Sequence, residues 1–221
     1  VFAVKGAATD AFLARLSGAV GGSAPGTMLT RGIRAAFGRG LEHATGVAGV
    51  KVLAFAPPPS AATQASPSVA VTDARNLLAH PALATEVFGP FALVVLAENI
   101  DEIVACTNAL DGQLTATFHA TSADLAEAQA LLEAAERVAG RLIVNGFPTG
   151  VEVCPAMNHG GPYPATTDVR FTSVGTAAIL RFARPVCYQG FAEAQLPVEL
   201  RNENARGILR TVNGELTRAP L

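Results

Sequence analysis

Short apolar runs alternate along the chain with stretches of helical spacing. Apolar runs typical of strands cover residues 1–4, 50–56, 68–71, 91–97, 115–119 and 142–144. Helical spacing marks the segments 9–20, 33–41, 73–83, 99–104 and 121–139. Short continuous strands between amphipathic helices indicate a mainly parallel sheet covered by helices on both faces. The pattern therefore predicts an α/β fold.

Polar residues and glycines predict where several helices begin and end. Thr9 is expected to cap the first helix, and Asn99 or Asp101 the helix that follows the strand at 91–97. The run that begins at Thr121 resembles a capping box, because an acidic residue follows three positions later. Gly140 is expected to end the helix that starts there.

The pattern changes after Gly146. Residues 147–172 are rich in Gly, Pro and Thr, which is typical of a long functional loop. Residues 173–182 are expected to form a helix. The segment 185–189 is expected to form an edge strand, because a proline at its start removes a ladder donor. The tail from residue 191 onward has little periodicity.

Composition narrows the class of protein. Only 15% of the 221 residues are charged, against about 25% in typical soluble domains, so Ala-rich helices or burial against a partner are expected. The net charge is −2 and no basic stripe is visible, which argues against nucleic-acid binding. No apolar run approaches the ~20 residues that a membrane span needs. Three widely spaced cysteines fit a reducing, cytoplasmic setting.

Familiar motifs of other site classes are absent. The sequence has no G-x-G-x-x-G after a strand, no P-loop and no G-x-S-x-G elbow. Cys154 and His159 are five residues apart with nothing nearby to complete a zinc site, so no metal is expected. Cys154 is interpreted as an incidental loop residue and Cys106 as a core residue on a helix face.

The segment Glu86–Pro90 has the residue types of a nucleotide site. It lies at one end of the predicted strand 91–97, and α/β sheets bind ligands at strand ends. A carboxylate at position 86 can accept hydrogen bonds from both hydroxyls of a ribose, and the ring of Phe88 can pack on a flat heterocycle. From spacing alone, the favoured alternative is a helix-end glutamate and a core phenylalanine before a Gly-Pro turn.

Several segments of the sequence together resemble the motifs of a known family. The segment Glu86–Pro90, with residues 112–116 and 140–146, resembles motifs of the aldehyde dehydrogenase superfamily. Residues 147–154, 159–166, 172–178 and 184–189 are similar to its 2-oxoglutarate semialdehyde (2,5-dioxopentanoate) dehydrogenase branch. The resemblance covers essentially the whole chain, most weakly over 50–69.

The resemblance implies an enzyme that oxidises 2-oxoglutarate semialdehyde with NAD or NADP. A cysteine thiolate attacks the aldehyde, hydride passes to the nicotinamide, and water activated by a glutamate releases the acid. Glu86 would hold the nicotinamide ribose, and Phe88 would flank the nicotinamide ring. The substrate side would be lined by Phe147, Thr149, Val151 and His159.

The same resemblance implies that the catalytic cysteine and the general-base glutamate lie upstream of Val1, together with the N-terminal cofactor-binding half. Val1 also reads as part of a strand, so preceding sequence is expected. We therefore predict no catalytic residue in this chain and no activity of the chain alone. Neither Cys154 nor Cys187 stands at the matching position.

The family pattern further implies a domain division. Residues 1–183 would form part of the catalytic domain, and residues 184–221 an oligomerisation strand and tail of a homodimer or homotetramer. Arg170 is a possible contact of the substrate carboxylate, but an ion pair near the helix from Ser173 is the preferred interpretation. The alternative to an enzyme fragment is a non-enzymatic oligomerisation or binding domain derived from the family.

Overall fold

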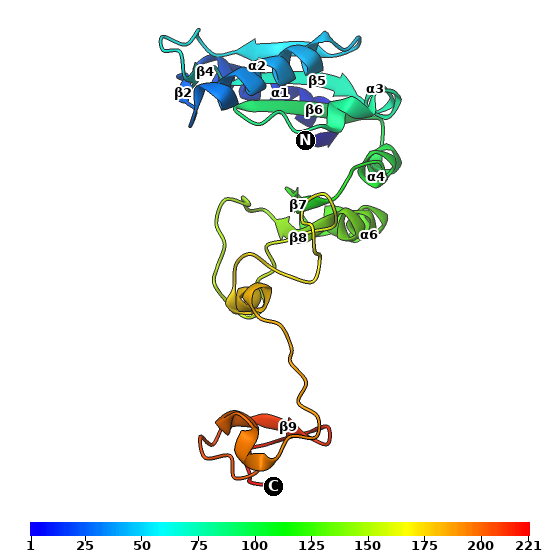
Figure 1. Ribbon diagram of the computed structural model, residues 1–221. Helices are drawn as coiled ribbons and strands as arrows, with labels where there is room; N and C mark the ends of the chain where they lie inside the picture. Colours follow the sequence, from blue (N-terminus) through cyan, green and yellow to red (C-terminus); the bar gives the residue numbers. More distant parts are fainter. The chain divides into compact units, whose positions relative to one another are not determined.

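The computed structural model describes residues 1–221, which divide into two compact units, Val1–Ala178 and Ile179–Leu221 (Figure 1). Each unit has its own secondary structure and is described separately. The catalytic and oligomerisation roles given above to residues 1–183 and 184–221 remain predictions.

The first unit contains a four-stranded sheet with the strand order β1-β6-β5-β3. Its strands are β1 (Phe2–Val4), β3 (Lys51–Phe55), β5 (Ser68–Asp73) and β6 (Phe91–Ala97). The β1–β6 and β5–β6 pairs are parallel, whereas β3 pairs with β5 in the antiparallel sense. The prediction of an α/β fold with a mainly parallel sheet is therefore confirmed. One edge of β1 has no strand partner.

Two shorter pairs complete the strands of this unit. Strands β7 (Gln113–Phe118) and β8 (Ala139–Val144) form a separate parallel pair. Strands β2 (Gly26–Thr27) and β4 (Gln64–Ala65) form a two-residue antiparallel contact. The continuous pattern in the sequence does not distinguish one sheet from several, because each strand shows the same apolar run in either case.

The helices pack around the four-stranded sheet and beside the β7–β8 pair. They are α1 (Ala7–Gly21), α2 (Arg31–Gly46), α3 (Ala74–Ala79), α4 (Ile100–Asn108), α5 (Ser122–Glu127), α6 (Gln129–Val138) and the 3-10 turn η1 (Pro81–Ala84). The core of buried residues joins α2, α3, η1 and α4 to β6. Its members are Ala44, Ala74, Leu77, Leu83, Val95, Ala97, Ile103 and Cys106.

Two of the three predicted N-caps are present in the structure, and one is not. Asn99 caps α4, with Glu102 N donating to its Oδ1 at 3.0 Å, and the capping box at Thr121 is formed. Thr9 is not a cap, because α1 already begins at Ala7, and the Thr9 hydroxyl donates to the Val4 carbonyl instead. The helix predicted over 121–139 is broken at Ala128 into α5 and α6.

Gly140 does not end a helix. It is the second residue of β8, where the backbone of Gly160 crosses so closely that a Cβ on Gly140 would lie 2.0 Å from the Gly160 carbonyl oxygen. The glycine is thus required by a contact between distant segments. A rule for local helix ends cannot distinguish this use of glycine from a C-cap.

Toward the C-terminus one prediction holds in part and one is wrong. The helix expected over 173–182 is the shorter 3-10 helix η2 (Thr176–Phe182), and residues 185–189 form no strand. A strand needs a partner for its backbone groups, and this segment has none within the chain. The tail is more ordered than its periodicity indicates: it forms η3 (Glu193–Gln195), η4 (Val198–Leu200) and a hairpin of β9 (Arg210–Val212) with β10 (Glu215–Thr217).

Candidate functional site

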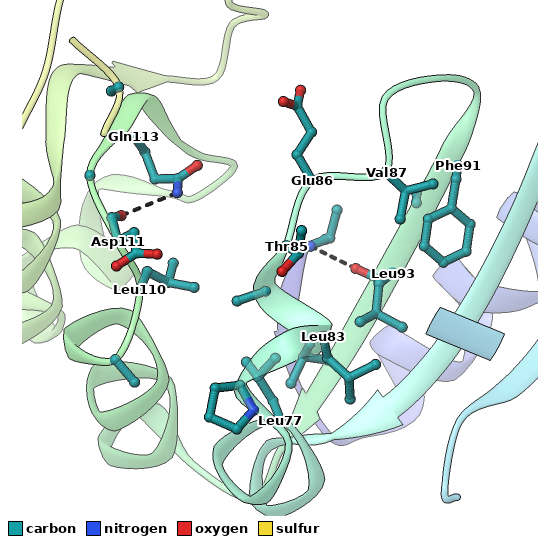
Figure 2. A pocket seen from close by; sticks show the side chains of 18 of the residues that line it. Leu77, Leu83, Thr85, Glu86, Val87, Phe91, Leu93, Leu110, Asp111 and Gln113 are labelled. Carbon is teal, nitrogen blue, oxygen red and sulfur yellow. Dashed lines mark hydrogen bonds between the residues drawn. The ribbon is translucent and has the colours of Figure 1, made fainter. Parts of the chain in front are cut away.

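The segment that precedes β6 alternates between buried and exposed side chains. Leu83 is buried and Val87 packs against the core, whereas Glu86 and Phe88 are exposed. Figure 2 shows the Glu86 side chain extending away from Leu83 and Val87. Val87 packs against the core between Glu86 and Phe88, and both of these residues are exposed on the other side of the segment.

Helix α2 fixes this segment through two close contacts. The ring of Phe37 is buried, with 3% of the residue exposed. It packs so closely on Gly89 that a Cβ at position 89 would lie 2.3 Å from Phe37 Cδ2. A Cβ on Gly40 would lie 3.3 Å from Val87 Cγ1. Gly89 also has a φ of 154°, which disfavours other residues. The glycine of the predicted motif therefore lets the segment pack on a buried ring before it enters β6.

A cavity of about 1190 Å³ opens beside this segment. Its walls are residues 84–89, the first residues of β1 and β6, and the turn 109–115 before β7, together with Pro164 and Ala165. Polar groups are few and come from opposite walls: Thr85, Glu86, Asp111, Gln113 and Thr115. Most of the other lining side chains are apolar, and a concave site with a few polar groups among apolar side chains is the usual form of a small-molecule site. Phe88 contributes a ring that is 65% exposed.

The wall opposite Glu86 comes from the turn after α4. Gln113 Nε2 donates to the Asp111 carbonyl oxygen at 3.1 Å, which closes this turn (Figure 2). None of the four ion pairs in the chain involves Glu86 or Asp111. Both carboxylates therefore keep acceptor capacity for a ligand. The sequence analysis did not identify Asp111 and Gln113 as site residues, although residues 112–116 resemble a motif of the aldehyde dehydrogenase superfamily.

The cavity lies at the amino ends of β1 and β6, not at the carboxyl ends that usually bind ligands in α/β sheets. The carboxyl ends of this sheet carry charge pairs instead. Lys5 pairs with Glu98, which raises the pKa of Lys5, and Arg75 Nε lies 3.7 Å from Glu102 Oε1. Only about 90 Å³ remains open there. The general rule for strand ends therefore does not explain this site.

The four predicted substrate-loop residues do not line the cavity. Phe147, Thr149 and Val151 are exposed, and the Phe147 ring lies 5.6 Å from the His119 ring. His159 is half-buried in a network of its own. The structure thus brings Glu86 and Phe88 to one cavity but leaves these four residues outside its walls. Their role as a substrate loop stays a prediction.

His159 is held by the residues before η2. Its backbone N–H donates to Thr172 Oγ1 at 2.7 Å, and its Nδ1 lies 2.9 Å from Ser173 Oγ. The Ser173 hydroxyl also lies 2.9 Å from the His159 carbonyl oxygen. Thr172 is 6% exposed. These contacts fold the long loop back on itself.

Three glycines let the same loop lie directly on the β7–β8 pair. A Cβ on Gly112 would come within 2.0 Å of the Pro162 carbonyl oxygen, and one on Gly161 within 2.2 Å of the Gln113 carbonyl oxygen. Gly140 makes the third such approach, to Gly160. Because the loop is docked in this way, the residues that follow, Pro164 and Ala165, reach the cavity.

Arg170 forms an ion pair and lies outside the cavity. Its Nε and Nη2 donate to the two carboxylate oxygens of Asp168 at 2.9 and 2.6 Å. The hydrogen bonds from Arg170 lower the pKa of Asp168 to about 2. The ion pair expected for Arg170 is therefore present, with Asp168 as its partner.

The cysteines lie apart from one another and differ in exposure. Cys106 is fully buried, as predicted for a core residue, and its Sγ lies 3.7 Å from the Ala74 carbonyl oxygen. All three cysteines are free, and no group of three or more His, Cys, Asp or Glu side chains is arranged to hold a metal ion. None of the helices has the length and apolar character that crossing a membrane requires.

Comparison with known proteins places this geometry in context. No protein-family model matches the sequence. Over 97% of its length the chain is 42% identical to alpha-ketoglutaric semialdehyde dehydrogenase 2 of Azospirillum brasilense. Over 98% it is 42% identical to alpha-ketoglutaric semialdehyde dehydrogenase of Acinetobacter baylyi. The chain spans 41% of the length of each of these relatives.

Solved structures agree on the fold. A succinic semialdehyde dehydrogenase from Streptococcus pyogenes in complex with NADP+ matches 72% of this chain and 35% of its own, with a TM-score of 0.55 and 16% identity. PnpE in complex with nicotinamide adenine dinucleotide matches 72% of this chain and 34% of its own, with a TM-score of 0.58 and 22% identity. The fold therefore matches that of part of an aldehyde dehydrogenase. Within that class, the sequence is similar to alpha-ketoglutaric semialdehyde dehydrogenases, so the predicted resemblance is confirmed.

Proposed function

We propose that this chain forms part of an NAD(P)-dependent dehydrogenase that oxidises alpha-ketoglutaric semialdehyde to 2-oxoglutarate. The observation that carries the proposal is the pairing of Glu86 and Phe88 on one cavity, in a chain 42% identical to such enzymes over 97% of its length. The named relatives supply the substrate, and the NAD- and NADP-bound neighbours supply the cofactor class.

Glu86 has the properties needed to hold the cofactor's ribose. Its carboxylate has no ion-pair partner in the chain and lies on the cavity, so its oxygens remain free to accept hydrogen bonds from two hydroxyls. Phe88 offers an exposed ring beside it for packing on a flat heterocycle. When bound, the nicotinamide cofactor supplies the hydride acceptor of the reaction.

The chain itself contributes binding surface and no nucleophile. Cys106 is buried, and neither Cys154 nor Cys187 is among the cavity residues. We therefore propose that the catalytic cysteine and the general base belong to the part of the enzyme that the relatives have and this chain does not match. The loop carrying Phe147 and His159 would then complete the substrate side. The chain alone is expected to be inactive.

Assembly and location form the finer part of the proposal. The segment 183–190 has no strand or helix of its own and exposes Val186 and Tyr188, which supports a role in joining subunits of a homodimer or homotetramer. Three free cysteines favour a reducing compartment such as the cytoplasm.

The test is a chimera in which this chain replaces the matching 41% of the Azospirillum relative. Aldehyde-dependent formation of NADH or NADPH is expected from the chimera and not from the chain alone. In the chimera, Glu86→Gln should raise the KM for NAD+ or NADP+ at least about tenfold, because hydrogen bonds to a charged group contribute about 1.5–3 kcal/mol and 1.4 kcal/mol corresponds to a factor of ten. Phe88→Ala should raise it about two- to tenfold, because aromatic stacking contributes about 0.5–1.5 kcal/mol.

The control is Glu127→Gln, which removes an exposed carboxylate on α5 away from the cavity. It should leave the KM for the cofactor unchanged. A soluble chimera without turnover would refute the assignment of the reaction. If the chimera is active and neither Glu86→Gln nor Phe88→Ala changes its KM for the cofactor, the assignment of the site is refuted.

A further inference from the structure

Arg141 on β8 binds the first part of the long loop, residues 147–157. Its Nη2 donates to the Pro148 carbonyl oxygen at 2.7 Å, and its Nη1 to the Gly150 carbonyl oxygen at 3.4 Å. Nη1 also lies 3.8 Å from Met157 Sδ. One side chain from a strand thus contacts three separate points of the loop.

The partners of Arg141 are unusual for an arginine. No carboxylate pairs with it, since the four ion pairs of the chain all involve other residues. Its Nε is buried without a hydrogen-bond partner. The guanidinium is planar with donors at fixed angles, so it can hold two carbonyl groups in one relative position. A lysine offers one point charge and cannot reproduce this geometry.

A second contact anchors the loop to the same strand. Asn158 Nδ2 donates to the carbonyl oxygen of Gly140, the residue before Arg141, at 2.9 Å. Beyond it, His159 is fixed by Thr172 at 2.7 Å. Residues 147–157 contain no helix or strand of their own, and side-chain contacts hold them to β8 near both ends, at Pro148 and Gly150 and at Met157. Arg141 supplies most of these contacts.

We propose that Arg141 is a positioning residue, which holds residues 147–157 in the conformation that serves the substrate side of the site. It acts through the loop and does not touch the substrate itself. This inference rests on the proposed function, because the loop acts on the substrate only in that enzyme. One part of the inference, that Arg141 restrains the loop, can be measured in a chain that has no enzymatic activity.

The first experiment measures the restraint in this chain. Endoproteinase Glu-C cleaves after glutamate, and Glu152 lies exposed within the loop. Arg141→Met should accelerate cleavage after Glu152 about tenfold, and Arg141→Lys should give an intermediate rate. Cleavage after Glu42 in α2 reports general unfolding and should not change. The matched control is Arg15→Met, because Arg15 is exposed on α1 and forms no ion pair.

The second experiment uses the chimera with two aldehydes, alpha-ketoglutaric semialdehyde and butanal, which lacks a carboxylate. Positioning predicts that Arg141→Met raises the KM for both about tenfold while kcat changes less than about threefold. A KM increase confined to the carboxylated aldehyde, with unchanged cleavage after Glu152, would overturn the proposal and make Arg141 an anion contact. Unchanged cleavage and unchanged KM for both aldehydes would also overturn it.

An inactive parental chimera would refute the proposed function, and the cleavage rates in this chain would still decide whether Arg141 restrains the loop. If Arg141→Met alters cleavage after Glu42 as well, Arg141→Lys provides the comparison, since it keeps the charge and most of the side-chain volume. An unaltered rate after Glu152 in Arg141→Lys, with folding intact, would contradict the requirement for a planar fork.

Discussion

The contact between Gly140 and the loop allows a quantitative test by substitution with alanine. A Cβ at position 140 would lie 2.0 Å from the carbonyl oxygen and 2.6 Å from the carbonyl carbon of Gly160, and 2.8 Å from Gly161 Cα. Ordinary contact begins near 3.4 Å, so the loop backbone must move by more than 1 Å. All three atoms belong to backbone, and no side chain can rotate away.

The expected cost follows from this geometry. Inserting a methyl group into a packed site costs about 1–3 kcal/mol, and a clash with backbone alone belongs at the upper end. Movement of the loop would also weaken the hydrogen bond from Asn158 to the Gly140 carbonyl oxygen. We expect Gly140→Ala to lower the free energy of unfolding by about 3 kcal/mol, which lowers Tm by roughly 6–12 °C in a chain of this size.

Gly18→Ala is the matched control, because it makes the same chemical change at a position with room for a methyl group. Gly18 lies within α1, and a Cβ there would meet no atom within 4 Å. Alanine at such a position should stabilise the chain by about 0.4–1 kcal/mol. Urea unfolding followed by circular dichroism measures both variants. If Gly140→Ala unfolds within about 0.5 kcal/mol of the parent chain, the loop does not lie on β8 as described.

Two further predictions concern ionisable groups. Arg170 holds the pKa of Asp168 at about 2, so the ion pair contributes stability above the ordinary pKa of an aspartate, and this contribution is lost as pH falls through about 2. An NMR titration of Asp168 should show this midpoint, and Arg170→Gln should return it towards 3.8; a midpoint unaffected by Arg170→Gln would contradict the pairing. Burial, followed by the nearby charge of Glu102, raises the pKa of the Cys106 thiol. A thiol reagent should therefore modify Cys187 and Cys154 in the folded chain but Cys106 only after denaturation, as mass spectrometry of labelled peptides can show; early labelling of Cys106 would mean that its surroundings are open.

Most of the strands, and the caps at Asn99 and Thr121, could be predicted because their signals are local. The run of residues 91–97 is apolar whatever its neighbours are, and the side chain of Asn99 caps the helix that begins one residue later. The short motif at residues 86–90 was enough to predict that Glu86 and Phe88 serve one site, because Val87 between them packs against the core. These features depend on a few consecutive residues, which a sequence displays directly.

The features that could not be predicted depend on contacts between distant segments. Gly140 looks like a helix end in the sequence, and only the path of Gly160 shows why no side chain is tolerated. Asp111 carries no signal of its own, because it reaches the cavity only through the packing of α4 and β7. The segment 185–189 has the composition of a strand, but no partner for it exists within the chain.

The pairing of β1 with β6 also has a consequence for how the chain folds during synthesis. Phe2 lies opposite Val95, and the backbone nitrogen of Val1 donates to the Leu93 carbonyl oxygen, 92 positions away. Contacts so far apart in sequence form slowly, because the intervening chain must first be ordered. The apolar run at residues 1–4 must therefore wait on the ribosome until β6 has emerged. During that interval it is an unpaired apolar strand of the kind that chaperones protect from aggregation.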